Sequence, residues 1–173
     1  MMKPGIKATL RAGSVAVCAT LAVAFAGAAP ASAAPYNTFL VNAASGKCLE
    51  VPGGNYNNGA PVQQWGCNWG DNQKWAVYPT ADGYSMIVNV QTGKCLEVAD
   101  WRTDQGAPVR QWECTNGANQ HWVVSGKDAN NQVTVRNRNS WMVIDDPGAS
   151  GANGTQMIQW KYNYGANQIW TVR

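Results

Sequence analysis

The tetrapeptide Asn72-Gln73-Lys74-Trp75 returns as Asn119-Gln120-His121-Trp122 and once more as Asn167-Gln168-Ile169-Trp170. From the first copy to the second the numbering advances by 47, and from the second to the third it advances by 48. A long and nearly constant period indicates that the chain repeats one structural unit, and it decides the architecture before any local pattern does. The sequence therefore predicts three units, at approximately residues 36–82, 83–129 and 130–173.

The segment at positions 1–34 has the features of a secretory signal peptide. Lys3, Lys7 and Arg11 form a basic start, residues 14–29 form an apolar run, and Ala31-Ser32-Ala33 is a small-residue cleavage site. The alternative is a membrane anchor, but a span needs roughly 20 apolar residues. We expect residues 1–34 to be removed, and residues 35–173 to form one secreted, extracellular domain that does not insert into membranes.

The predicted mature part is nearly neutral and rich in tryptophan. Three of the 13 basic residues lie in the signal segment, which leaves ten basic residues against ten acidic ones. No basic cluster remains, and this argues against nucleic acid or an anionic membrane as a partner. All nine tryptophans lie in the mature part. Such a composition suits a ligand that is bound by stacking and by neutral hydrogen bonds.

Four cysteines remain in the mature part: Cys48, Cys67, Cys95 and Cys114. An even number in a secreted chain indicates disulfides, and four cysteines allow three pairings. The repeat favours Cys48 with Cys67 and Cys95 with Cys114, because the two pairs have the same sequence separation and each closes within its own unit. A metal site is the competing interpretation, but the chain has a single histidine and no Cys-x-x-Cys motif. We expect neither a metal nor a cofactor.

The three units align without gaps if the third is set at an offset of 48 from the second rather than 47. This offset places Val143 and Tyr162 where the second unit has its two cysteines, so both halves of the disulfide are replaced together. It also aligns Asp145 with Glu50 and Glu97.

Short strands fill each unit, and Gly, Asn and Pro clusters separate them. The strand-length runs of the first unit are 38–41, 48–51, 62–65 and 74–77. No segment sustains helical periodicity over two turns. Four strands in each of three units give twelve strands, and closing the units around an axis avoids exposed sheet edges.

Three units that each end in Gln-x-Trp, with a Cys-Leu-acid-Val strand near the start, resemble the ricin-type lectin domains. The resemblance covers the whole predicted mature chain. It implies an all-β fold, the β-trefoil, in which six strands form a barrel and six form a hairpin cap. It also implies a shallow, metal-independent sugar pocket in each unit, commonly for galactose-type or xylose-type sugars.

In that family the pocket uses an acid on the early strand, an aromatic platform on the next strand, and the Asn-Gln pair. The residues at these positions are Glu50, Trp65, Asn72 and Gln73 in the first unit, Glu97, Trp112, Asn119 and Gln120 in the second, and Asp145, Trp160, Asn167 and Gln168 in the third. An indole packs against the apolar face of a pyranose, while the carboxylate and the Asn exchange hydrogen bonds with its hydroxyls. The Gln is expected to brace the carboxylate from behind.

The third unit keeps the most family-like site, although it lacks the disulfide. Glu50 and Glu97 stand where the family usually has Asp, and the extra methylene moves the carboxylate by more than about 1 Å. Each position also has a plainer interpretation. The acids can be solvated strand residues, and the platform tryptophans can simply pack.

The other aromatic residues divide into core and loop positions. The tryptophans of the three Gln-x-Trp motifs, Trp75, Trp122 and Trp170, are expected in the core. The loop residues Trp69, Trp101, Tyr56 and Tyr164 either extend a site for a longer glycan or are ordinary surface aromatics.

These features predict a secreted, non-catalytic, monomeric carbohydrate-binding protein. The alternative is a trefoil that recognises protein, such as a protease inhibitor, with degenerate sugar sites. An enzyme is disfavoured because His121 occupies a variable position and has no matched nucleophile. Asp145 and Asp146 are adjacent on a strand and point to opposite faces, so they cannot flank one bond.

Overall fold

The computed structural model describes residues 1–2 and 33–173. The predicted signal peptide therefore falls almost entirely outside the described residues. Within the described part of the chain, no helix is both long enough and apolar enough to cross a membrane.

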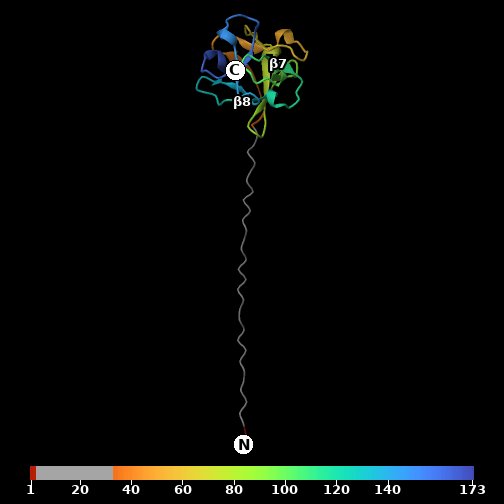
Figure 1. Ribbon diagram of the computed structural model, residues 1–173, viewed down its shortest axis with the longest axis vertical. Helices are drawn as coiled ribbons and strands as arrows, with labels where there is room; N and C mark the ends of the chain where they lie inside the picture. Colours follow the sequence, from red (N-terminus) through yellow and green to blue (C-terminus); the bar gives the residue numbers. More distant parts are fainter. Residues whose placement is uncertain (3–32) are drawn as a thin grey trace.

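Fourteen strands and six short 3₁₀ turns make up the described structure (Figure 1). The first unit contains β1 (Tyr36–Asn42), β2 (Cys48–Glu50), β3 (Gln63–Trp65) and β4 (Lys74–Pro79). The second contains β5 (Ser85–Asn89), β6 (Cys95–Val98), β7 (Val109–Trp112) and β8 (His121–Val124). The third contains β9 (Gln132–Val133), β10 (Val135–Asn137), β11 (Val143–Asp145), β12 (Thr155–Gln156), β13 (Ile158–Trp160) and β14 (Trp170–Val172). The 3₁₀ turns are η1 (Pro52–Gly54), η2 (Asp71–Gln73), η3 (Ala99–Trp101), η4 (Ala118–Gln120), η5 (Pro147–Ala149) and η6 (Ala166–Gln168).

The structure has fourteen strand segments rather than twelve, because two strands of the third unit are divided. β9 pairs with β14 whereas β10 pairs with β8, so the chain changes neighbour at Thr134. β12 likewise pairs with β3 of the first unit, whereas β13 pairs with β11. If each divided strand is counted once, the fourteen strands become the twelve that were expected.

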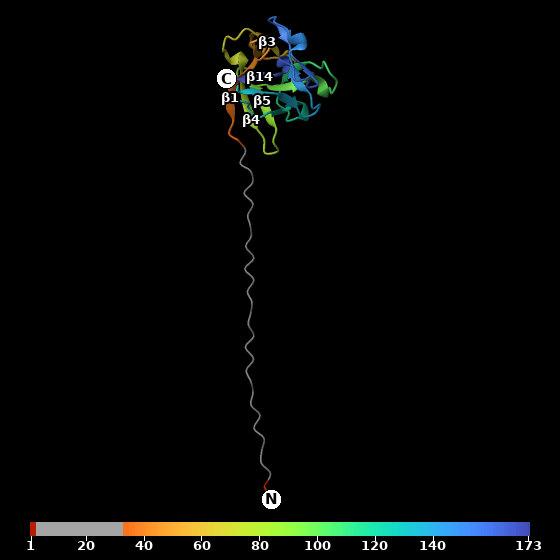
Figure 2. The same ribbon diagram turned by 90° about the vertical axis from the view of Figure 1, so that its left-hand side faces the viewer.

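Six of these twelve strands close a barrel. The ring runs from β1 through β4, β5 and β8 to β10, continues from β9 to β14, and returns to β1. Figure 2 shows β1, β4, β5 and β14 side by side in this ring. The remaining strands pair as the hairpins β2–β3, β6–β7 and β11–β13, one for each unit. This arrangement confirms the β-trefoil.

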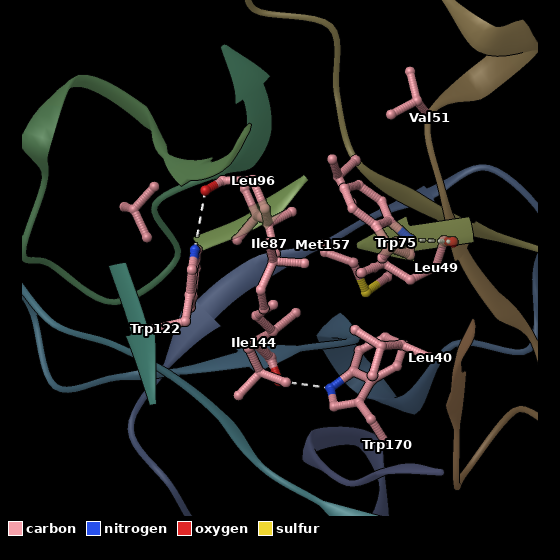
Figure 3. Close-up of a cluster of buried hydrophobic side chains, with 14 of the residues drawn as sticks. Leu40, Leu49, Val51, Trp75, Ile87, Leu96, Trp122, Ile144, Met157 and Trp170 are labelled. Atoms are coloured by element: carbon pink, nitrogen blue, oxygen red, sulfur yellow. Dashed lines mark hydrogen bonds between the residues drawn. The ribbon is translucent and has the colours of Figure 1, made fainter. Parts of the chain in front are cut away.

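The three tryptophans of the repeated motif occupy the centre of the core. Trp75, Trp122 and Trp170 are each 0% exposed, and their rings surround a shared cluster of aliphatic side chains (Figure 3). Each indole Nε1 donates a hydrogen bond to a strand carbonyl, at 3.0 Å to Leu49, 3.0 Å to Leu96 and 3.4 Å to Ile144. A buried indole needs such a partner, so each motif tryptophan also ties β2, β6 or β11 to the barrel.

The predicted disulfides are both present, as Cys48–Cys67 and Cys95–Cys114. In the third unit Val143 lies opposite Trp160, as Cys95 lies opposite Trp112, and this agrees with the offset chosen for the third unit.

Candidate functional site

Three pockets lie on the hairpins, and each contains an acid in the last two residues of a strand. Their cross-strand partners are Gln63 for Glu50, Arg110 for Glu97 and Ile158 for Asp145. The platform tryptophan stands two residues after that partner, and alternate residues of a strand share a face. The acid, its cross-strand partner and the platform indole therefore face the same side. We call the three sites the first, second and third pockets, in chain order.

A glutamine holds the acid of each pocket from behind. These glutamines are fully buried, and each Nε2 donates both to one carboxylate oxygen and to the backbone carbonyl seven residues earlier. The carboxylate contacts measure 2.9 Å from Gln73 to Glu50, 2.9 Å from Gln120 to Glu97 and 2.7 Å from Gln168 to Asp145. This is the geometry expected for a brace.

The neighbouring asparagine donates to the same carboxylate oxygen. The contacts are 3.2 Å from Asn72 to Glu50, 3.2 Å from Asn119 to Glu97 and 3.1 Å from Asn167 to Asp145. Each asparagine also donates to the carbonyl of the residue after the acid. One carboxylate oxygen is thus engaged identically in all three pockets, and the pockets differ in what happens to the other oxygen.

Each platform indole rests on a loop from a different unit. A Cβ built on Gly106 would lie 3.8 Å from Cζ3 of Trp160, and the corresponding pairs are Gly59 with Trp112 at 3.5 Å and Gly154 with Trp65 at 3.7 Å. These three glycines have φ between 81° and 84°, which L side chains rarely adopt. The glutamine before each platform is fully buried and donates to two carbonyls of the same foreign loop. Every pocket is therefore built from two units.

The third pocket leaves one acid oxygen without a donor. Asp145 Oδ2 accepts both amide hydrogen bonds, whereas Oδ1 accepts none from residues 33–173, because the apolar Ile158 lies opposite. Asp145, Ile158, Trp160 and Asn167 line a cavity of about 390 Å³. Burial raises the pKa of Asp145, and the amides of Gln168 and Asn167 oppose that rise.

In the first pocket the second oxygen has a neutral donor. Gln63 Nε2 donates to Glu50 Oε1 at 2.8 Å. The cavity measures about 460 Å³, and Gln91 from the next unit completes its lining. Its platform, Trp65, is 42% exposed, close to the 38% of Trp160. An exposed indole beside a carboxylate oxygen that accepts only one hydrogen bond, from a neutral donor, is compatible with a bound sugar.

In the second pocket the second oxygen is bound by a cation. Arg110 Nε donates to Glu97 Oε1 at 2.8 Å, and its Nη2 donates to Asp100 at 2.9 Å. The guanidinium carbon also lies 4.4 Å from the ring centroid of Trp112. The remaining cavity measures only about 220 Å³.

The cross-strand position occupied by Gln63, Arg110 or Ile158 was not predicted from the sequence. The sequence does indicate this position, because it lies two residues before each platform tryptophan and alternate strand residues share a face. The glutamine between the two positions, which ties the units together, was also missed as a functional residue. Both roles depend on which strand lies opposite.

The other candidate residues lie outside the pockets or at their edges. His121 is buried between Asn116 and Arg138, and burial lowers its pKa. Of the loop aromatics, Trp101 lines the second pocket and Trp69 packs edge-on against Phe39. The other two contribute to none of the three pockets: Tyr164 contacts Tyr162, and Tyr56 is exposed. The described residues hold no cluster of three metal-binding side chains.

Asp146 follows Asp145 but does not share its site. Its side chain is 0% exposed, and neither carboxylate oxygen has a hydrogen-bond partner among the described residues. Burial and the charge of Asp145 raise the pKa of Asp146 to about 6, and the nearby Gln64 amide offsets part of this rise. The equivalent residues Val51 and Val98 belong to the hydrophobic core.

Comparisons with known proteins agree with this geometry. A family model described as ricin-type beta-trefoil lectin domain-like matches residues 29–112 and 118–173. ThreeFoil, a designed three-fold symmetric protein, is 34% identical with a TM-score of 0.76, and the match covers 79% of this chain and 96% of that one. An exo-β-1,3-galactanase from Clostridium thermocellum is 32% identical with a TM-score of 0.75, over 79% of this chain and 29% of the enzyme. The Rhizoctonia solani agglutinin shares the fold at 24% identity and a TM-score of 0.71, over 83% and 98% of the two chains. A comparison with curated protein sequences found no match.

Proposed function

Because the chain belongs to the ricin-type β-trefoil lectin family, we propose that it is a secreted, non-catalytic, monomeric protein that binds galactose-type or xylose-type glycans. The observation that carries this proposal is the third pocket. There a carboxylate oxygen to which none of residues 33–173 donates, an exposed indole and a half-buried Asn line one cavity.

The third pocket can hold a pyranose without a metal. The apolar face of the sugar stacks on Trp160, and two neighbouring hydroxyls point toward the acid. One hydroxyl donates to Asp145 Oδ1, and the Asn167 carboxamide oxygen accepts a hydrogen bond from the other. Gln168 keeps the carboxylate in place, so little side-chain entropy is lost on binding.

The first pocket is the second proposed site, with Glu50, Trp65 and Asn72 in the same roles. A shallow pocket of this kind binds with a Kd of about 1 mM, or about −4 kcal/mol. Two such pockets on one rigid body gain through avidity when the ligand is a polymer or a glycan-covered surface. The likeness to part of an exo-β-1,3-galactanase makes β-1,3-galactan a suitable first polymer to test.

The proposal is tested by NMR titration of the nine indole N–H signals with galactose, lactose and xylo-oligosaccharides. We expect the Trp160 signal to shift first and to saturate. Substitution of Trp160 by Ala should remove the response of the third pocket while the Trp65 response persists. If no indole responds to any glycan and the fold is intact, the proposal is wrong, and protein recognition becomes the better hypothesis.

A further inference from the structure

In the second pocket the acid and the platform are engaged by Arg110, and the asparagine is covered. The first group is the acid. Gln120 and Asn119 donate to one oxygen of Glu97, and Arg110 donates to the other at 2.8 Å. The corresponding oxygen of Asp145 has no donor from residues 33–173. A sugar hydroxyl is a neutral donor, and it would have to displace a hydrogen bond in which both the donor and the acceptor are charged.

The second group is the platform. The guanidinium of Arg110 lies 4.4 Å from the ring centroid of Trp112, where a pyranose would stack. Asp100 holds the other side of the same guanidinium at 2.9 Å. Trp112 is accordingly half-buried, whereas Trp65 and Trp160 are exposed.

The third group is the asparagine. A Cβ built on Gly117 would lie 2.7 Å from both Trp101 Cζ2 and Asn119 Oδ1, so the indole of Trp101 stands beside the Asn119 side chain. Asn119 is only 3% exposed, and its Oδ1 has no donor within the described part of the chain. Asn72 and Asn167, by contrast, are half-buried and line open cavities.

The backbone of Trp101 and of the residue before it is strained. Asp100 and Trp101 have φ of 54° and 56°, a region that non-glycine residues rarely adopt. The equivalent pairs are Gly53-Gly54 in the first unit and Gly148-Ala149 in the third. Two contacts hold the strained pair, the ion pair of Asp100 with Arg110 and a hydrogen bond from Asn139 Nδ2 to the Trp101 carbonyl at 3.1 Å. Strain of this kind persists only where surrounding contacts hold the residues in place.

We infer that Arg110 acts as an internal ligand of the second pocket and that Trp101 is its cover, so that the protein presents two working sugar pockets rather than three. Arg110 stacks on the platform as a sugar would, and it pairs with the acid that a sugar would contact. The statement that two pockets bind sugar rests on the proposed function. The occupancy of the second pocket by Arg110 does not, and it has its own test.

The first experiment compares indole NMR titrations of the wild type and of variants that carry the third unit's residues. In the wild type the Trp112 signal should stay still at glycan concentrations that saturate the third pocket. In Arg110→Ile, and more fully in Arg110→Ile with Trp101→Ala, Trp112 should respond with an affinity within about tenfold of that at Trp160. Arg102→Ala is the matched control, because it removes a nearby exposed arginine that pairs with Asp104 instead.

The second experiment needs no glycan. Arg110→Ala should bind ethylguanidinium saturably, returning the Trp112 signal toward its wild-type position, whereas ethylammonium should not. A wild-type Trp112 that responds to glycan as Trp160 does would overturn the inference. So would an Arg110→Ala variant with an unchanged Trp112 signal and no ethylguanidinium binding. If ethylguanidinium binds but no indole in any variant responds to glycan, the proposed function fails while the internal ligand stands.

Discussion

The second and third units share one backbone frame, yet they treat their pockets in opposite ways. In both, the bracing glutamine and its asparagine neighbour donate to one carboxylate oxygen at nearly the same distances. Opposite the acid, however, the second unit has Arg110 and the third has Ile158. The arginine binds the remaining oxygen, whereas opposite the isoleucine that oxygen accepts no hydrogen bond from residues 33–173.

The contrast extends beneath the pockets. The second unit is closed by the disulfide Cys95–Cys114 and has Val98 in its core. The third has Val143 and Tyr162 in place of the two cysteines, and it has Asp146 at the position of Val98. Threefold symmetry is therefore strict at the motif tryptophans and at the amides that hold each acid, and it is relaxed at positions that decide ligand access or local stability.

The largest effect is expected from substitutions in the core, which the two units share. Trp122→Ala and Trp170→Ala each remove a fully buried indole and its hydrogen bond, so each should lower the free energy of unfolding by about 3–5 kcal/mol. Urea denaturation measures both. A much smaller loss for Trp170 would mean that the cores of the two units are not equivalent.

The next effect concerns the buried acid of the third unit. The folded-state pKa of Asp146 is raised from 3.8 to about 6, so the folded protein binds more protons between these values, and stability falls as pH rises through that window. Asp146→Val should therefore stabilise the protein by about 3 kcal/mol at pH 7, with a much smaller gain below about pH 4.

Urea denaturation at several pH values checks this prediction, with substitution of the exposed Asp71 by Asn as the control. Asp145, whose pKa is also raised by burial, contributes in the same direction and keeps its contribution in the variant. An equal gain at acidic and neutral pH would assign the effect to packing rather than to the charge.

A smaller gain is expected from restoring the missing disulfide. Val143 and Tyr162 occupy the positions of Cys95 and Cys114, whose Cα atoms are 5.1 Å apart. Val143→Cys with Tyr162→Cys should add about 2 kcal/mol, below the roughly 3 kcal/mol for a loop of this size, because contacts of Tyr162 with Tyr164 and Arg136 are lost. Thermal unfolding with and without reductant measures the gain, and mass spectrometry verifies the bond.

The smallest change in free energy is expected when the arginine of the second pocket is introduced into the third. Ile158→Arg should weaken glycan binding at Trp160 by at least about tenfold, or about 1.4 kcal/mol, because the new guanidinium can bind Asp145 and cover the platform. Ile158→Gln, which copies the first unit, is the matched control and should keep most of the binding. Unchanged affinity in Ile158→Arg would show that the cross-strand residue does not distinguish the two pockets.

Much of the fold and the frame of the pockets could be predicted from the sequence. The spacing of the Asn-Gln-x-Trp motifs predicted three units, and the equal separation of the cysteines predicted both disulfides. The motif tryptophans were expected in the core, and the glutamines were expected to brace the acids. These features repeat at one period, and a period can be read from a single chain.

What the sequence determined by itself is the repeated unit, because the motif residues that build it recur at a nearly constant interval along the chain. Only the tertiary structure decided the state of each pocket. Arg110 meets Glu97 because two strands pair in one register, and Trp160 rests on Gly106 because the units close on one another. These contacts join side chains from different strands or different units, which only the closed barrel and its hairpins bring together.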